Sequence, residues 1–232
     1  MLFEDYVYFS ILIAGILFAA ILLSELRRFN KKLPKSWRNS SSINTFGLGV
    51  CFLMIHLIIT FICEAISSYF SAHGIYNHFV TSICYTFSLP FLFGFFFLNT
   101  QARWKRYAYF IIYFSLIIHL ISGEYYHPDS VMPVSTVLFT FSVHFVAAFL
   151  HLTDQLLKPK TDFFKFQLQI SLIIMIHGLI ASIMTSFFIS GFSENSDLIF
   201  YIQYFSTVFF YLLFALAILN EVIKIRRRLN SN

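Results

Sequence analysis

A single carboxylate and a set of histidines are the residues most able to do chemistry, because they lie inside strongly apolar segments. Glu64 stands well within the apolar segment 45–70. A carboxylate in membrane hydrocarbon costs about 2.5 kcal/mol or more, so such a residue faces the interior of a helix bundle. We therefore expect Glu64 either to act in function or to hydrogen-bond Ser or Thr on a neighbouring helix.

Four histidines fall at a similar depth in four apolar segments: His56, His119, His144 and His177. Counted from the basic ends of their segments, they lie about 15–18 Å deep, near the midplane of a core about 30 Å thick. Imidazoles at one depth could ligate haem or a metal ion, or relay protons. No segment carries a closely paired His motif, so hydrogen bonding between helices is the alternative. His151 lies nearer the rim.

Two of these histidines allow a geometric prediction. The segments that carry His56 and His177 run in the same direction, and both residues lie at the same distance from the boundary of their segment. Because a lipid-facing imidazole would be left without a partner, both rings should turn inward. We expect His56 and His177 to face one interior cavity.

The composition excludes a water-soluble domain. The chain has 232 residues, of which 58% are hydrophobic and 12% are charged, against about 45–50% and about 25% in soluble domains. Soluble enzymes, DNA-binding domains and disulfide scaffolds are excluded. The sequence predicts an all-α polytopic membrane protein with one domain, residues 1–232. Its seven transmembrane helices are expected at 6–23, 45–70, 79–100, 107–121, 132–152, 166–190 and 198–222.

The basic residues predict the orientation of the bundle. All 16 Lys and Arg residues follow the first, third, fifth or seventh segment. Basic residues in short loops stay in the cytoplasm, so we expect the N-terminus outside and the C-terminus in the cytoplasm. We then expect the positive charge of these loops to contact anionic lipids of the inner leaflet, and not nucleic acid. We expect inner-membrane anchoring by Arg27, Arg28, Lys31, Lys32, Arg103, Lys105, Arg106, Arg226, Arg227 and Arg228.

The sequence lacks the characteristic residues of several classes of membrane enzymes and cofactor proteins. The last segment has no lysine for a retinal Schiff base, and no Asp lies within the predicted segments. Membrane zinc hydrolases and magnesium-dependent transferases need such acids. We therefore expect no enzymatic activity and no resident cofactor, with haem or a metal ion at the histidines as the alternative.

Part of the chain resembles a group of bacterial membrane proteins. The stretches Glu64-Ala-Ile-Ser-Ser-Tyr, Ile75-Tyr-Asn-His-Phe and Tyr85-Thr-Phe resemble the second and third helices of short seven-helix proteins, mostly uncharacterised, from Bacteroidetes-type bacteria. The resemblance covers about a quarter of the chain. It implies a location in the bacterial inner membrane and a sensory or accessory role in signalling.

Three functions follow as hypotheses. The first is a membrane sensor or accessory module that acts through a cytoplasmic or membrane partner and binds a small apolar molecule between its helices. The second is a haem, metal or proton-relay protein that uses the midplane histidines. The third is a small-solute transporter, although Pro90 and Gly94 interrupt only one half of the chain, whereas transporter repeats carry matching interruptions.

The predicted orientation can be tested with reporter fusions. Reporters placed after Arg38, Lys105, Lys160 and Asn232 should all read as cytoplasmic, because each site follows a basic loop. A periplasmic signal at the C-terminus would contradict the seven-span arrangement.

Overall fold

The computed structural model describes residues 3–32, 41–74, 78–123, 134–157, 163–189 and 196–231. These stretches hold seven α-helices and no strand, which confirms the all-α prediction for the described part of the chain. The helices are α1 (Phe3–Lys32), α3 (Ser41–Ala72), α4 (His78–Asn99), α5 (Arg103–Ser122), α6 (Val134–Leu156), α7 (Phe164–Ile189) and α8 (Ser196–Ser231).

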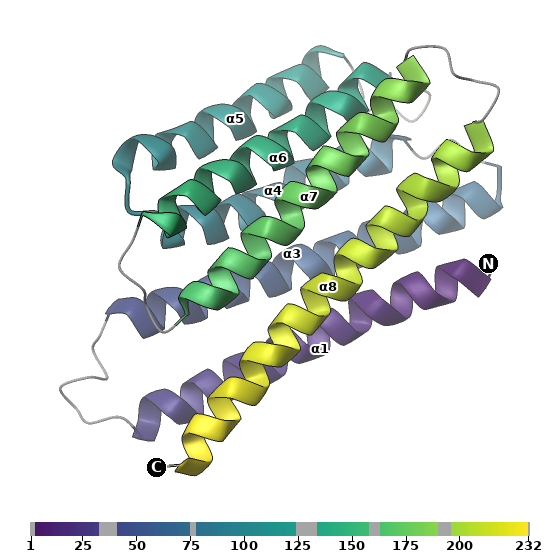
Figure 1. Ribbon diagram of the computed structural model, residues 1–232. Coiled ribbons are helices and arrows are strands. Elements are labelled where there is room, and N and C mark those ends of the chain that lie inside the picture. Colours follow the sequence, from purple (N-terminus) through teal and green to yellow (C-terminus); the bar gives the residue numbers. More distant parts are fainter. Residues whose placement is uncertain are drawn as a thin grey trace.

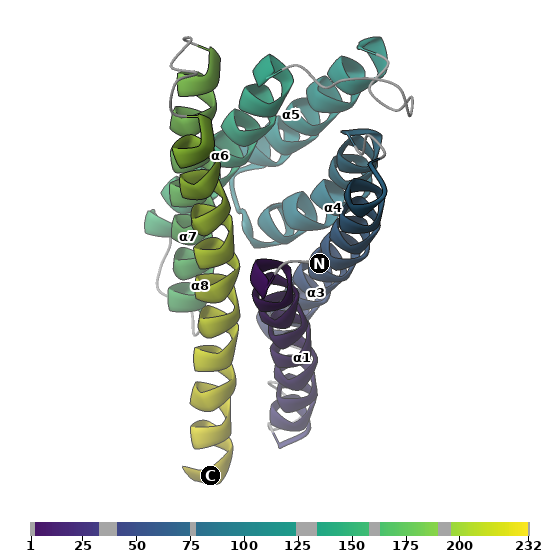
Figure 2. The same ribbon diagram turned by 90° about the vertical axis from the view of Figure 1, so that its right-hand side faces the viewer.

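The helices pack as a closed ring (Figures 1 and 2). α1 packs against α3, α3 against α4, α4 against α6, α6 against α7, and α7 against α8. The ring closes because α8, the last helix, returns to pack against α1, the first. α5 lies outside this ring, against α4 and α6.

Six of the helices are long and apolar enough to cross a membrane, and α5 is the exception. The first turn of α5 carries Arg103, Lys105 and Arg106, so its apolar part is short. The predicted fourth span, 107–121, therefore stays a prediction. Helix ends also differ from the predicted segments: α1 continues to Lys32 and α8 to Ser231, because basic residues end an apolar run without ending a helix.

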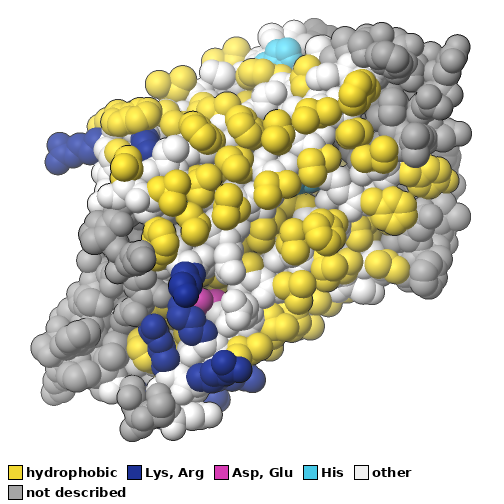
Figure 3. All heavy atoms as spheres, in the orientation of Figure 1, with side chains coloured by type: hydrophobic (Ala, Val, Ile, Leu, Met, Phe, Trp, Pro, Cys, Tyr) yellow, Lys and Arg dark blue, Asp and Glu magenta, His cyan; other side chains and the backbone are white. Residues whose placement is uncertain are grey.

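The outside of the bundle is apolar between its two ends. Figure 3 shows hydrophobic side chains spread over one face, with Lys and Arg gathered toward one end. We name this end, where α1, α4, α6 and α8 finish and α5 and α7 begin, the basic end. On α5 the exposed side chains include Phe110, Ile111 and Ile118, each at least half exposed. Such a surface is typical of contact with lipid.

Close packing between α6 and α7 depends on a small residue. A Cβ atom at Gly178 would lie 2.9 Å from the backbone nitrogen of Phe145 and 3.0 Å from the carbonyl oxygen of Phe141. In lipid, apolar contact alone gives helices little reason to associate, so small residues that allow backbones to approach are important.

The missing hydrogen bond at Pro90 of α4 allows a contact with the peripheral helix α5. Proline has no N–H, so the carbonyl of Thr86, four residues earlier, cannot receive the usual helical hydrogen bond. The hydroxyl of Tyr113 in α5 donates to this carbonyl at 2.9 Å. The break in the hydrogen-bond ladder of α4 therefore becomes an attachment point for α5.

Candidate ligand-binding site

A cavity of about 180 Å³ lies in the middle of the ring, lined by residues of α1, α3, α4, α6, α7 and α8. We name it the central cavity. Its lining is unusually polar for an apolar bundle, since it includes Glu64 and the three histidines His56, His144 and His177. Five aromatic rings also line it, from Tyr8, Tyr85, Phe141, Phe210 and Tyr211.

The structure places His56 and His177 in the lining of the same cavity, as their equal depth predicted. His144 joins them from α6. His119 does not: its ring nitrogen Nε2 lies 2.9 Å from the Thr136 hydroxyl, between α5 and α6. Depth along a helix can be counted from sequence, but rotation about the helix axis decides which histidines meet.

Two of the cavity histidines have a defined tautomer when neutral. His56 Nδ1 lies 3.1 Å from the Ser88 carbonyl, and His144 Nδ1 lies 2.8 Å from the Thr140 carbonyl. A carbonyl only accepts, so Nδ1 must carry the proton in both rings. The other ring nitrogen, Nε2, is then a hydrogen-bond acceptor.

His177 differs, because its ring is held by stacking. The ring stacks on Phe210 with centroids 4.3 Å apart and meets Phe141 edge-on at 5.8 Å. Its Nδ1 atom is buried and has no hydrogen-bond partner among the described residues. Leaving a buried polar atom unpaired costs about 1–3 kcal/mol, so a ligand in the cavity that hydrogen-bonds this nitrogen would gain stability from the contact.

The neighbour of Glu64 is a tyrosine rather than the Ser or Thr that the sequence suggested. The Tyr8 side chain, from α1, interacts with its carboxylate. Tyr8 also meets the ring of Tyr211 of α8, and Tyr211 interacts with Thr60 of α3. These contacts link α1, α3 and α8 at the carboxylate end of the central cavity.

The cavity suits a small organic ligand better than haem or a metal ion. Pockets for drug-sized molecules measure roughly 300–1,000 Å³, so haem, a larger molecule than most drugs, exceeds the space. Within the described ranges, no group of three or more His, Cys, Asp or Glu side chains could hold a metal ion.

A second polar cluster, which was not predicted from the sequence, lies near the basic end. We name it the basic-end network: Asn99, His151, Gln155, Gln167 and Ser171, all buried. Gln155 Nε2 donates to the backbone carbonyl of Asn99 at 2.9 Å, and Gln167 Nε2 donates to the side-chain oxygen Oδ1 of Asn99 at 2.6 Å. His151 lies 2.6 Å from the Ser171 hydroxyl through Nδ1 and 3.1 Å from Gln155 through Nε2. The network joins α4, α6 and α7.

Asp154 extends this connection to α5. Its carboxylate oxygens accept the N–H groups of Gln101 at 3.0 Å and Ala102 at 3.3 Å, directly before α5 begins. Ala102, in the N-cap position of α5, has no side-chain oxygen for capping, and the Asp154 carboxylate lies beside this helix N-terminus, where a negative charge is favourable. A second bond joins the same two helices, since Lys105 of α5 donates to the Thr153 hydroxyl of α6 at 2.9 Å.

His151 lies near the basic end, but its side chain is fully buried between the helices. The predicted segment ended at residue 152, whereas α6 continues to Leu156 and so includes Asp154 within the helix. One signal in the sequence could have found the network: His151, Asp154 and Gln155 are spaced to share one helix face.

An apolar layer separates the central cavity from the basic-end network. Leu89 and Leu92 line the cavity on α4, and Phe95 and Phe96 follow on the next turn. These four side chains are almost completely buried. Phe95 and Phe96 pack against His151, with ring centroids 5.8 Å and 4.9 Å away. Polar groups are therefore not continuous along α4.

Comparison of the chain with protein-family models, with curated proteins and with solved structures finds no match. The resemblance to short seven-helix bacterial proteins therefore stays a prediction.

The basic-end network predicts a stability difference between two glutamines on α7. Gln167→Leu removes the donor to Asn99 and leaves a buried acceptor unpaired, so we expect a loss of about 1–3 kcal/mol in the free energy of unfolding. Gln169 is exposed on the same helix, and Gln169→Leu should change stability by about 0.5 kcal/mol or less. Thermal unfolding in detergent measures both. Equal losses would contradict the network.

Proposed function

We propose that this chain is a membrane sensor or accessory protein that binds a small ligand in the central cavity and acts through a partner at the basic end. The observation that carries the proposal is a cavity at the centre of the bundle whose lining includes a carboxylate and three histidines. A ligand there would contact six helices at once. If the ligand binds one arrangement of these helices more tightly than another, it shifts the bundle toward that arrangement. A partner protein that contacts the bundle can respond to the shift.

The chemistry of the lining favours a small amine with an aromatic or aliphatic body. The Glu64 carboxylate and the Nε2 atoms of His56 and His144 are acceptors, so the ligand must supply donors. An ammonium group supplies three donors and a positive charge, and aromatic faces such as those of Tyr85 and Phe210 attract cations. The sequence alone favoured an apolar ligand; the polar lining favours one with a charged head.

We further propose seven spans in a bacterial inner membrane, with the N-terminus outside and the basic end in the cytoplasm. The gathering of Lys and Arg at one end supports this orientation. The exposed apolar side chains of α5 support its contact with lipid as a seventh span.

The binding role is favoured over the alternatives by two observations. A transporter or proton relay needs a polar path across the membrane, and the apolar layer at Leu92, Phe95 and Phe96 interrupts such a path along α4. A haem protein needs more space than the central cavity offers.

Three probes with the same ring test the proposed ligand class: 2-phenylethylamine, 2-phenylethanol and phenylacetate, which carry a cation, a neutral group and an anion. We expect only the amine to raise the Tm of the purified protein in neutral detergent, because only the amine supplies a charged donor to Glu64. At a concentration about 100 times Kd, the stabilisation should reach about 2.7 kcal/mol.

Glu64→Gln keeps the size and hydrogen bonding of the side chain and removes its charge. This variant should fold and lose the shift caused by the amine. His73→Gln is the matched control, since His73 is exposed and outside the lining of the central cavity, and it should keep the shift. An amine effect that survives in Glu64→Gln, or equal protection by the alcohol, would contradict the proposal.

A further inference from the structure

A basic groove lies between α1 and α8 at the basic end, remote from the central cavity. Its volume is about 550 Å³, and its charged lining consists of Glu25, Arg28, Lys31, Lys32 and Arg226. The two helices that form it come from opposite ends of the chain and lie side by side (Figure 2). We name it the α1–α8 groove.

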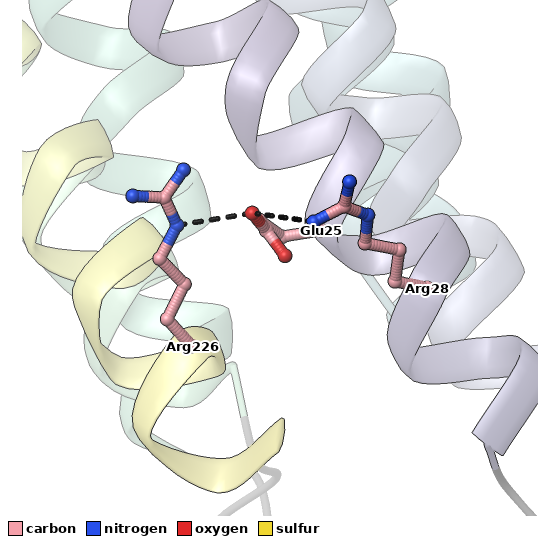
Figure 4. Close-up of polar contacts among 3 residues, drawn as sticks. All are labelled: Glu25, Arg28 and Arg226. Carbon is pink, nitrogen blue, oxygen red and sulfur yellow. Dashed lines mark hydrogen bonds and ion pairs between the residues drawn. The ribbon is translucent and has the colours of Figure 1, made fainter. Parts of the chain in front are cut away.

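A buried carboxylate organises the groove. The Glu25 side chain is only 6% exposed, and its Oε1 atom lies 3.0 Å from Arg226 Nε and 3.7 Å from Arg28 Nη1. Figure 4 shows this carboxylate between the two guanidinium groups, with Arg226 presenting its Nε edge. Both arginine side chains are more than half exposed. Glu25 therefore fixes two cationic groups whose other N–H donors remain available at the surface.

The groove carries more positive charge than its acid neutralises. Among the described residues that line the groove, four are basic and one is acidic. Lys32 donates to the Leu229 carbonyl across the groove at 2.7 Å, so its ammonium group is held in place without losing charge. Lys224 lies outside the lining of the groove and is paired with Glu221.

The position of the groove relative to the apolar bundle indicates the source of an anion. The apolar segments 6–23 and 198–222 are followed directly by the basic residues of α1 and α8 that line the groove, so the groove lies where the hydrocarbon of a membrane gives way to phospholipid phosphates. Exposed apolar side chains, among them Leu17 and Leu216, continue along both helices away from the basic end. These side chains suit contact with acyl chains.

We propose that the α1–α8 groove binds the phosphate of an anionic phospholipid headgroup. Arg28, Lys31, Lys32 and Arg226 supply the charge, and Glu25 positions Arg226. The preference for basic cytoplasmic loops explains Lys and Arg near the ends of spans. It does not explain a buried acid that holds arginines from two helices in one place, and a phosphate site does.

Lipid binding to the full chain in neutral detergent tests this proposal, with phosphatidylglycerol, phosphatidylcholine and inorganic phosphate as separate probes. We expect phosphatidylglycerol to raise the Tm and to remain bound as one molecule per chain in native mass spectrometry. Phosphatidylcholine and phosphate, at equal concentration, should do neither. Protection by inorganic phosphate alone would overturn the lipid source, and equal protection by phosphatidylcholine would overturn anion recognition.

The double variant Arg28→Gln/Lys31→Gln leaves the contact between Glu25 and Arg226 in place and should weaken the binding of phosphatidylglycerol about tenfold or more. Arg103→Gln/Lys165→Gln is the matched control, because it removes two exposed charges at the same end but outside the groove. This control should retain full binding. Equal losses in both variants would show general attraction to charge and overturn the site.

If the first double variant does not fold, the single variants Arg28→Gln and Lys31→Gln replace it. Each exposed side chain should contribute a smaller, graded loss of phosphatidylglycerol binding. Wild-type binding in both single variants would overturn the proposal.

Discussion

The first and last helices of the chain lie side by side, and at the basic end Glu25 of α1 contacts Arg226 of α8 at 3.0 Å. This closure is the constraint on which the interior depends. Helices in lipid gain little from apolar contact with one another, so their association depends on close packing and on hydrogen bonds between helices. An open row of the same helices would expose the polar lining of the central cavity to lipid, where unpaired groups are costly.

The closure also assembles the carboxylate end of the central cavity. Tyr8 of α1 meets Tyr211 of α8 edge-on, with ring centroids 5.6 Å apart, and Tyr8 interacts with the carboxylate of Glu64 in α3. One contact between helices thus positions the groups that we propose for ligand binding, while another, at the basic end, forms the α1–α8 groove. The two proposed sites lie on one pair of helices and are connected through its packing.

The sequence predicted the features that depend on composition and periodicity along one helix. The helical class, most of the spans and the shared depth of His56 and His177 follow from apolar length and from counting residues. The separation of His119 from the other three histidines could not be predicted, because it depends on how α5 is rotated and placed outside the ring. Almost all faces of these helices are apolar, so the sequence carries little information about rotation.

Contacts between distant segments were also beyond the sequence. Glu25 stands near basic residues in its own segment and gave no sign that Arg226 would reach it from α8. The partners of His151 were not predicted, because the apolar window ended at residue 152 and left Asp154 and Gln155 outside the segment. Tyr113, which bonds the carbonyl that Pro90 leaves open, has no local pattern that marks it. In each case the partner is selected by packing between helices rather than by spacing within one.

A double-mutant cycle on Glu25 and Arg226 tests the closure of the bundle most directly. Unfolding free energies of the wild type, Glu25→Gln, Arg226→Gln and the double variant give the coupling between the two side chains. If α1 and α8 close the ring as described, the coupling should be stabilising and about 0.5–3 kcal/mol. A coupling indistinguishable from zero, with the two single losses simply adding, would contradict the contact between α1 and α8 at the basic end.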